Sequence, residues 1–299
     1  MKPPDIQITK ATGERDTYDR EKLRGSLLRS GAKEHDAERV IDEVESQLRD
    51  GMSTRKIYRR AFQALRRDSV FAASRYQLKQ AVMELGPSGY PFERFIGAVM
   101  ESMGYQTSVG RIVSGRCVTH ELDVIGRKNG EIALVECKFR NQAGSKTDVR
   151  VPLYFHARFL DVAEAWKQDQ GRTWREMGLD LPGYLPGKGE EPVFKPWIIT
   201  NAKFTEDAVR YSQCAGISLM GWDYPGHRTL LTVIEEAQLM PLTLLQKLSR
   251  RDKTILLEEG VTTCRELYQN EIIMEKVGID RSRRRQTMKE LEGVLGLVR

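Results

Sequence analysis

Long apolar runs are missing from this sequence: no stretch of about 18 or more apolar residues, the length of a membrane-spanning helix, occurs in it. The opening residues, MKPPDIQITK, also lack the apolar core of a secretory signal peptide. We therefore expect a cytoplasmic protein that has no membrane partner.

Cysteine is scarce as well, with 4 residues in a chain of 299, at positions 117, 137, 214 and 264. No two of them have the Cys-x-x-Cys spacing typical of zinc sites, so a zinc cluster is not expected. Their wide spacing favours free thiols in a reducing compartment. The sequence also has no Walker-type G-x-x-x-x-G-K-[ST] loop, which argues against an ATP-driven motor.

Charge, by contrast, is abundant in both signs. The chain has 48 basic and 42 acidic residues, a net charge of +6 and a pI near 9.1. This basic excess favours a polyanionic partner, although an ordinary solvated surface has the same composition. The length predicts two or three domains, and a hydrophobic content of 40% is sufficient for a core in each.

Strand and helix periodicities divide the chain into three segments. Residues 1–86 have the pattern of a two-stranded hairpin followed by four amphipathic helices. Residues 87–232 have the pattern of a helix, three strands, a helix and a strand–helix–strand unit, with a Pro/Gly-rich loop at 181–192. Residues 233–299 are helical throughout. The fold class expected is multidomain α/β, with a central mixed sheet and a C-terminal helical bundle.

Charged residues interrupt two apolar strands of the second segment. Glu136 and Lys138 are two apart in IALVECKF, so alternation places their side chains on one face. Gly130 in KNGE predicts a hairpin of this strand with the preceding one, HELDVIGRK. Asp123 lies on that preceding strand and can therefore be adjacent to them. Two neighbouring carboxylates repel each other, and a bound Mg²⁺ would remove that repulsion. Lys138 could then orient a water molecule or stabilise phosphate charge, with Glu93 on the flanking helix as a further acid.

A plainer interpretation is that Glu136 and Lys138 form a solvated pair on an amphipathic strand. The apolar residues on both faces of IALVECKF argue against it, because charges in such a run are costly unless they are paired or metal-bound. The pattern by itself favours neither interpretation, since short motifs of this kind have many false matches.

The stretch 92–223 resembles the Mrr-like restriction endonucleases of the PD-(D/E)xK superfamily. The matching pieces, in order, are FERFIGAVMESMGY, ELDVIG, VECKF and ITNAKFTEDAVRYSQCAGISLMGWD. The resemblance implies a restriction-endonuclease-like sheet, a Mg²⁺ or Mn²⁺ cofactor and DNA as substrate. It implies Glu93, Asp123, Glu136 and Lys138 as the catalytic set, with Asp123 and Glu136 as metal ligands. Many relatives have glutamine at the position of Glu136.

Three further residues are candidate DNA contacts near this site. Lys203 follows a strand and precedes a helix, a turn that lies close to the site in the resembling family and can touch a phosphate. Plain capping of that helix by Thr205 is the alternative, and the more favoured one. Tyr154 and Arg158 are four apart on a helix and share a face. They could line a substrate groove, or Tyr154 could pack while Arg158 lies on the surface.

Residues 6–85 resemble the ATP-cone, a small regulatory domain best known from ribonucleotide reductases. The match consists of Ile-Thr-Lys-Ala-Thr-Gly at 8–13, then YDREKL, RKIYRRAFQAL and ASRYQL. The family's usual arginine is Ala11 here, which removes one contact to the nucleotide. The resemblance implies ATP or dATP as a regulatory ligand. The residues that it places at the nucleotide are Ile8, Lys10, Lys22 and Thr54. A helical module kept only for dimer contacts is the alternative.

The stretch ILLEEGVTTCRELYQNE in the third segment has the helix–Gly-Val–helix shape of a helix–hairpin–helix or SAM-like bundle. Such hairpins can present backbone N–H groups to DNA phosphates. Arg283 and Arg284 add positive charge nearby and are candidate DNA contacts. A solvated helix start in an interaction module explains the same residues.

Together these features predict a nucleotide-regulated, metal-dependent endonuclease that hydrolyses DNA for restriction or DNA processing. The alternative is a non-catalytic, nucleotide-responsive DNA-binding regulator that keeps the nuclease fold as a platform. A homo-oligomer, dimer or higher, is expected because cutting both strands needs two sites.

Overall fold

The helices and strands of the chain follow its hydrophobic periodicity and form a mixed α/β structure. The computed structural model describes residues 6–10, 13–86, 88–142, 144–169, 172 and 192–297. Ala11 and the part of the expected Pro/Gly-rich loop up to residue 191 lie outside these residues. The described elements form one five-stranded, one three-stranded and one two-stranded sheet. None of the described helices is both long and apolar enough to span a membrane.

The chain divides into two units, each described here by itself. Leu85–Leu239 form the central unit, and Met1–Glu84 together with Met240–Arg299 form the second, which we call the terminal unit. The segment expected as a separate module at 233–299 therefore belongs for the most part with the N-terminal residues. The central unit ends at Leu239, whereas the sequence predicted its end at residue 232.

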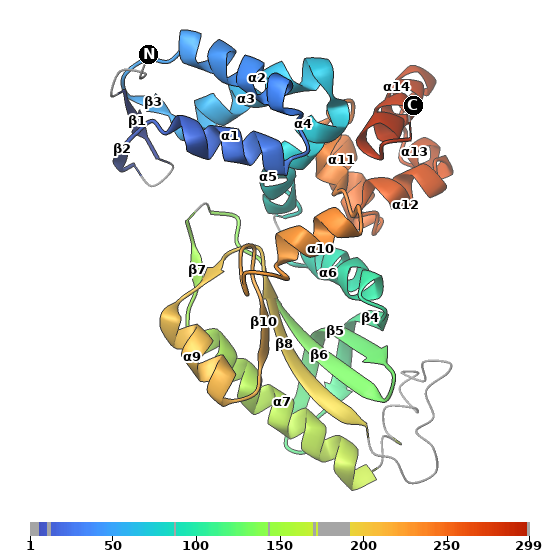
Figure 1. Cartoon of the computed structure of the whole chain (residues 1–299). Helices are drawn as coiled ribbons and strands as arrows, with labels where there is room; N and C mark the ends of the chain where they lie inside the picture. Colours follow the sequence, from blue (N-terminus) through green and yellow to red (C-terminus); the bar gives the residue numbers. More distant parts are fainter. Residues whose placement is uncertain are drawn as a thin grey trace. The chain divides into compact units, whose positions relative to one another are not determined.

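Five strands of the central unit form a mixed sheet in the order β10–β8–β6–β5–β4 (Figure 1). These strands are β4 (Gln106–Ser114), β5 (Thr119–Lys128), β6 (Glu131–Lys138), β8 (Val193–Thr200) and β10 (Ser218–Met220). β4, β5 and β6 pair antiparallel, whereas β6, β8 and β10 pair in parallel. The predicted hairpin of β5 and β6 is confirmed. Its turn residues, Asn129 and Gly130, have φ of 46° and 79°, the positive values that a two-residue hairpin turn favours.

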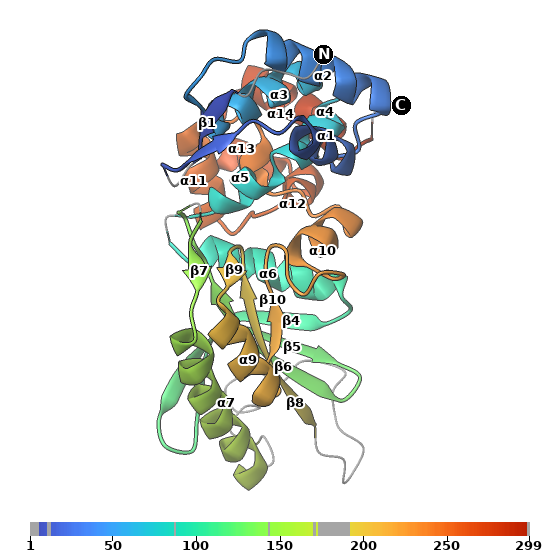
Figure 2. The same cartoon turned by 60° about the vertical axis from the view of Figure 1, so that its left-hand side comes forward.

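Helices cover both faces of this sheet (Figure 2). They are α6 (Tyr90–Ser102), α7 (Arg150–Asp169) and α9 (Glu206–Cys214), and a further helix, α10 (Leu230–Glu236), packs on α6. Phe155 of α7 shares a core with Ile132 and Leu134 of β6. Side chains alternate along a strand, so the buried Ala133 and Val135 face the other side, where α6 packs on β4, β5 and β6. The two-stranded sheet pairs β7 (Lys146–Thr147) with β9 (Lys203–Phe204).

The N-terminal part of the terminal unit contains the predicted hairpin and helices. Its elements are β1 (Gln7–Thr9), β2 (Arg15–Thr17), α1 (Arg20–Arg29), α2 (Glu34–Ser46), β3 (Met52–Ser53), α3 (Thr54–Asp68), α4 (Val70–Tyr76) and α5 (Leu78–Met83). β3 was not expected: it pairs in parallel with β1 directly before α3. The last of the four predicted helices is divided at Gln77 into α4 and α5.

The C-terminal helices pack on this N-terminal part through buried polar contacts. They are η1 (Leu242–Leu244), α11 (Arg250–Glu258), α12 (Cys264–Gln269), α13 (Ile272–Lys276) and α14 (Arg281–Val294). Thr243 Oγ1 donates to the Ala81 carbonyl at 2.6 Å. The buried Glu290 carboxylate accepts from Arg66 Nη2 at 2.8 Å and from the backbone N–H of Gln246 and Lys247. These long-range contacts explain why the two ends of the chain form one unit.

Replacing Glu290 with alanine is expected to destabilise the terminal unit by about 3 kcal/mol, because Arg66 and two backbone N–H groups lose their shared acceptor. Chemical unfolding monitored by circular dichroism measures this loss. Glu292→Ala, at a more exposed acid of the same helix, is the matched control and should leave stability within about 0.5 kcal/mol of wild type. Equal stability of the two variants would contradict the anchoring role.

Candidate active site

The four residues predicted as the catalytic set line one cavity of the central unit. Glu93, Asp123, Glu136 and Lys138 border a space of about 370 Å³, together with Cys137 and neighbouring residues. They come from three elements, α6, β5 and β6, which the fold brings together. The structure therefore places side by side the residues that the sequence separates by up to 45 positions.

The cavity opens where β5 and β6 stop pairing. Their ladder ends at Val124 opposite Val135, so Asp123 and Glu136 are the first residues beyond it. The Asp123 Oδ2 atom accepts the Cys137 N–H at 2.7 Å. The carboxylate thus satisfies a backbone donor at the point where the two strands separate, which fixes Asp123 beside Glu136.

Glu93 approaches from the first turn of α6. The helix begins after Gly89, and the Glu93 N–H donates to the Gly89 carbonyl at 3.0 Å. A Cβ atom at position 89 would lie 3.0 Å from Glu93 Oε1, so a glycine there leaves room for the carboxylate. Burial, with the charges of Glu121 and Glu136, raises the pKa of Glu93.

Burial and neighbouring negative charges destabilise the ionised carboxylates of the cavity. Burial, then the charge of Glu136, raises the pKa of Asp123 to about 7. Burial also raises the pKa of Glu136, although Arg158 and Lys138 oppose that effect. Desolvated acids that repel one another are stabilised by a bound divalent cation, so the donor set fits Mg²⁺ or Mn²⁺.

Two carboxylates of the cavity, those of Asp123 and Glu136, are sufficient for a Mg²⁺ site. Among the residues that the structure describes, no group of three or more His, Cys, Asp and Glu side chains is arranged to hold a metal ion. Mg²⁺ does not require such a group, because waters and substrate phosphates complete its shell around one or two carboxylates. Burial, followed by the charge of Asp123, raises the pKa of Cys137 well above its usual value. Its thiol is therefore neutral, and Asp123 and Glu136 remain the ligands that suit such a cation.

Arg158 of α7 is bound to the site instead of lying on the surface. Its Nη1 donates to Glu136 Oε2 at 2.7 Å and to the Glu121 carbonyl at 3.1 Å. Its guanidinium carbon lies 5.1 Å from the centre of the Tyr154 ring, which is exposed. The expected shared face of Tyr154 and Arg158 is present, but Arg158 neutralises Glu136. The i,i+4 spacing alone could not reveal this contact.

The turn after β8 supports the strand that carries Lys138. Thr200 Oγ1 donates to the Lys138 carbonyl at 2.6 Å. The buried Asn201 side chain accepts from the Arg140 N–H and donates to the Arg140 carbonyl, both at 2.8 Å. This turn therefore holds the backbone on either side of Phe139. Its polar residues serve the geometry of the site.

The remaining candidate DNA contacts form ion pairs with carboxylates. Lys203 Nζ lies 2.8 Å from Asp223, and Thr205 caps α9 as predicted. Arg283 pairs with Asp252 at 2.7 Å and with Asp280, and Arg284 pairs with Glu275. A cation that is already paired is a weaker anchor for a phosphate than a free one. These three residues are thus less suited to DNA than their sequence pattern suggested.

Three of the four residues expected at a nucleotide, Ile8, Lys10 and Thr54, lie on or next to the N-terminal sheet. Thr9 pairs with Ser53, so Lys10 and Thr54 follow neighbouring positions of β1 and β3. Ile8 is buried on the same strand. The bond from Lys10, followed by the Thr17 N–H and, more weakly, the charge of Lys22, lowers the pKa of Asp16. Lys10 thus pairs with Asp16, whereas the ion-pair partner of Lys22 is Asp19.

A polar cluster around Asp161 was not predicted from the sequence. His120 Nε2 lies 2.8 Å from Asp161 Oδ2, and the Cys117 N–H donates to Asp161 Oδ1 at 2.9 Å. These contacts lower the pKa of Asp161 to about 2, with the His120 bond the largest cause. A Cβ atom at Gly115 would lie 2.0 Å from the same carboxylate. The cluster ties the β4–β5 turn to α7.

The four cysteines are free, as predicted.

A mixed sheet with buried carboxylates and a lysine at the end of paired strands defines an α/β protein with an acidic candidate active site. Residues 240–295 match the family described as AF1548-like, C-terminal. A protein from Archaeoglobus fulgidus, described only as uncharacterized, is 32% identical over 202 residues, which cover 66% of this chain and 98% of that protein. The crystal structure of a protein of unknown function, AF1548, matches with a TM-score of 0.55 and 29% identity, over 70% of this chain and 99% of that one. The chain belongs to this AF1548-like family.

Proposed function

We propose that the central unit is a metal-dependent endonuclease of the PD-(D/E)xK type, which hydrolyses phosphodiester bonds of DNA. One observation carries the proposal: Glu93, Asp123, Glu136 and Lys138 border a single cavity where two strands separate. The order of the motifs around them, which resembles Mrr-like nucleases with a restriction-endonuclease-like sheet, supports it. Clustered buried acids give a pure DNA-binding surface no advantage, because they repel phosphate.

Asp123 and Glu136 would hold Mg²⁺ or Mn²⁺, which when bound polarises a phosphoryl oxygen and lowers the pKa of a coordinated water. Lys138, on the same face of β6 as Glu136, would orient the attacking water and stabilise the charge that develops on the phosphate. Glu93, with a raised pKa, would accept or hold a proton at the edge of the cavity. Two sites are needed to cut both strands, so the active form in this proposal is a homodimer or a higher oligomer.

In the same proposal, the N-terminal part of the terminal unit is an ATP-cone-like sensor of ATP or dATP. Lys10, directly after β1, and Lys22, in the first turn of α1, could together neutralise a polyphosphate. Ile8 and Thr54 would lie against the nucleotide. The ligand would bias assembly or activity, and it would not drive a motor.

A non-catalytic, nucleotide-responsive DNA-binding regulator is the second candidate. The contact of Arg158 with Glu136 favours it, because this guanidinium already neutralises one of the two carboxylates. Incubation of plasmid DNA with the full chain separates the two functions. Cleavage with Mg²⁺ or Mn²⁺ that stops in EDTA, and that ATP or dATP alters, supports the nuclease. Tight DNA binding without cleavage under either metal supports the regulator.

In the nuclease proposal, Arg158 positions Glu136 for the metal. Its Nη1 bonds Oε2, and such bonds to a ligating carboxylate orient it. Arg158→Gln is therefore expected to weaken Mn²⁺ binding by about 10-fold to 100-fold, the usual effect of removing a residue that orients a metal ligand. Calorimetric titration with Mn²⁺ measures the change. Arg210→Gln, an exposed arginine of α9, is the control. Tighter binding by Arg158→Gln would instead show that the arginine competes with the cation.

A further inference from the structure

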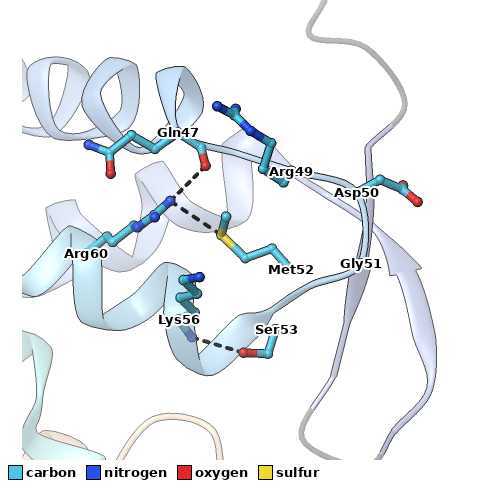
Figure 3. Close-up of a pocket in the computed structure, with 8 residues that line it drawn as sticks. All are labelled: Gln47, Arg49, Asp50, Gly51, Met52, Ser53, Lys56 and Arg60. Carbon is cyan, nitrogen blue, oxygen red and sulfur yellow. Dashed lines mark hydrogen bonds between the residues drawn. The ribbon is translucent and has the colours of Figure 1, made fainter.

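A second cavity, of about 530 Å³, lies in the terminal unit between the end of α2 and the start of α3. Three cations border it: Arg49, Lys56 and Arg60 (Figure 3). The carboxylate in its lining, Asp50, accepts the Gln7 N–H at 3.0 Å. In Figure 3 this carboxylate points away from the three cations. The space between the cations therefore has a positive charge that no acid among the described lining residues faces.

The two arginines are held by neutral partners. Arg60 Nη1 donates to the Gln47 carbonyl at 2.7 Å and contacts Met52 Sδ at 3.7 Å. Arg49 Nη1 donates to the Leu48 carbonyl at 2.8 Å. A carbonyl fixes the direction of a guanidinium without cancelling its charge. Both side chains therefore keep donors and a full positive charge for a ligand.

The contrast with the rest of the N-terminal part is what makes these cations unusual. Seven other cations there form ion pairs with acids, namely Lys10, Arg20, Lys22, Arg24, Arg39, Arg66 and Arg67. Within the described part of the chain, Arg49, Lys56 and Arg60 form no ion pair. The same holds for Arg55 and Arg59, on the adjoining face of α3. Five cations within twelve positions repel one another unless an anionic partner covers them.

We propose that this cationic cavity binds the phosphate backbone of a nucleic acid. Lys56 and Arg60 are four apart and share a face of α3, and Arg55 and Arg59 extend the charge along the helix. A single phosphate would engage one or two of these side chains, whereas a strand with one charge per nucleotide can engage all of them. The surface is distinct from the proposed nucleotide site, because Thr54 lies about 200° around the helix from Lys56.

Binding of a fluorescein-labelled DNA duplex to the full chain tests this surface. Anisotropy is measured in EDTA at several salt concentrations, so that binding is scored without cleavage and failure of the nuclease proposal leaves the result intact. The double variant Arg49→Gln/Lys56→Gln leaves Arg60 and its loop contacts in place. We expect its Kd to rise about tenfold and the slope of log K against log salt to fall by about 2, near one unit for each phosphate that the protein no longer neutralises.

Lys56→Gln and Lys33→Gln form a matched pair, because each removes one exposed lysine of the same unit. Lys33 lies directly before α2 and does not line the cavity. Only Lys56→Gln should weaken binding. Equal weakening by both variants would reduce the effect to net charge and overturn the proposal, as would an unchanged double variant or no DNA binding by wild type. Displacement of the duplex by pyrophosphate at equal phosphate concentration, absent in the double variant, would assign the cavity to a small polyphosphate and also overturn it.

Discussion

Lys138→Ala is expected to abolish DNA cleavage, with a loss of about 1000-fold or more, while the fold remains intact. The ammonium group lies beside two carboxylates, in the cavity where the phosphate would be attacked. Alanine removes the positive charge that would stabilise the transition state. The backbone contact of position 138 is kept, because Thr200 bonds its carbonyl and not its side chain.

The measurement is the rate of plasmid cleavage, on methylated and unmethylated DNA, with Mg²⁺ or Mn²⁺ and with or without ATP. Lys195→Ala is the matched control, since Lys195 is an exposed lysine of the neighbouring strand β8. It should cut at the wild-type rate. Circular dichroism and DNA binding establish that Lys138→Ala is folded and still engages its substrate. Wild-type cleavage by this variant would overturn the assignment of the site.

Much of the candidate site was predictable because it depends on local geometry. The spacing of Glu136 and Lys138 fixes a shared face on any strand, and the Asn129-Gly130 turn fixes which residues of β5 lie opposite β6. Asp123 then falls beside Glu136 without further information. Apolar residues at helical spacing likewise predicted α6, and with it the approach of Glu93.

The parts that escaped prediction depend on contacts between distant segments. Arg158 reaches Glu136 because α7 packs on the sheet in one particular position along the strands. The hydrophobic periodicity of α7 does not specify that position. Glu290 joins Arg66 across 224 positions, and no local pattern indicates that the two ends of the chain form one unit. The cationic cavity at Lys56 became visible only once the partners of the other cations were known.

Asp123→Asn removes a proposed metal ligand and also a buried charge, so it is expected to weaken metal binding and to stabilise the metal-free protein. Mn²⁺ binding should fall by about 100-fold, because one of two carboxylates is removed. The metal-free protein should become more stable near pH 8 by about 4 kcal/mol, because the pKa of Asp123 is raised to about 7 in the folded state. The amide oxygen can still accept the Cys137 N–H, so the strand end keeps its hydrogen bond.

The sign of the pH effect follows from that raised pKa. The folded state holds the Asp123 proton at a higher pH than the unfolded chain does, so wild-type stability falls as the pH rises from about 4 to 7. The asparagine variant should lose this part of the pH dependence. Urea unfolding in EDTA between pH 4 and 8 measures this pH dependence. The control is Asp148→Asn, at a partly exposed acid of the same unit whose pKa is lowered to about 2. A variant less stable than wild type at pH 8, with Mn²⁺ affinity unchanged, would mean that Asp123 is a structural hydrogen-bond acceptor and that the cavity is not a metal site.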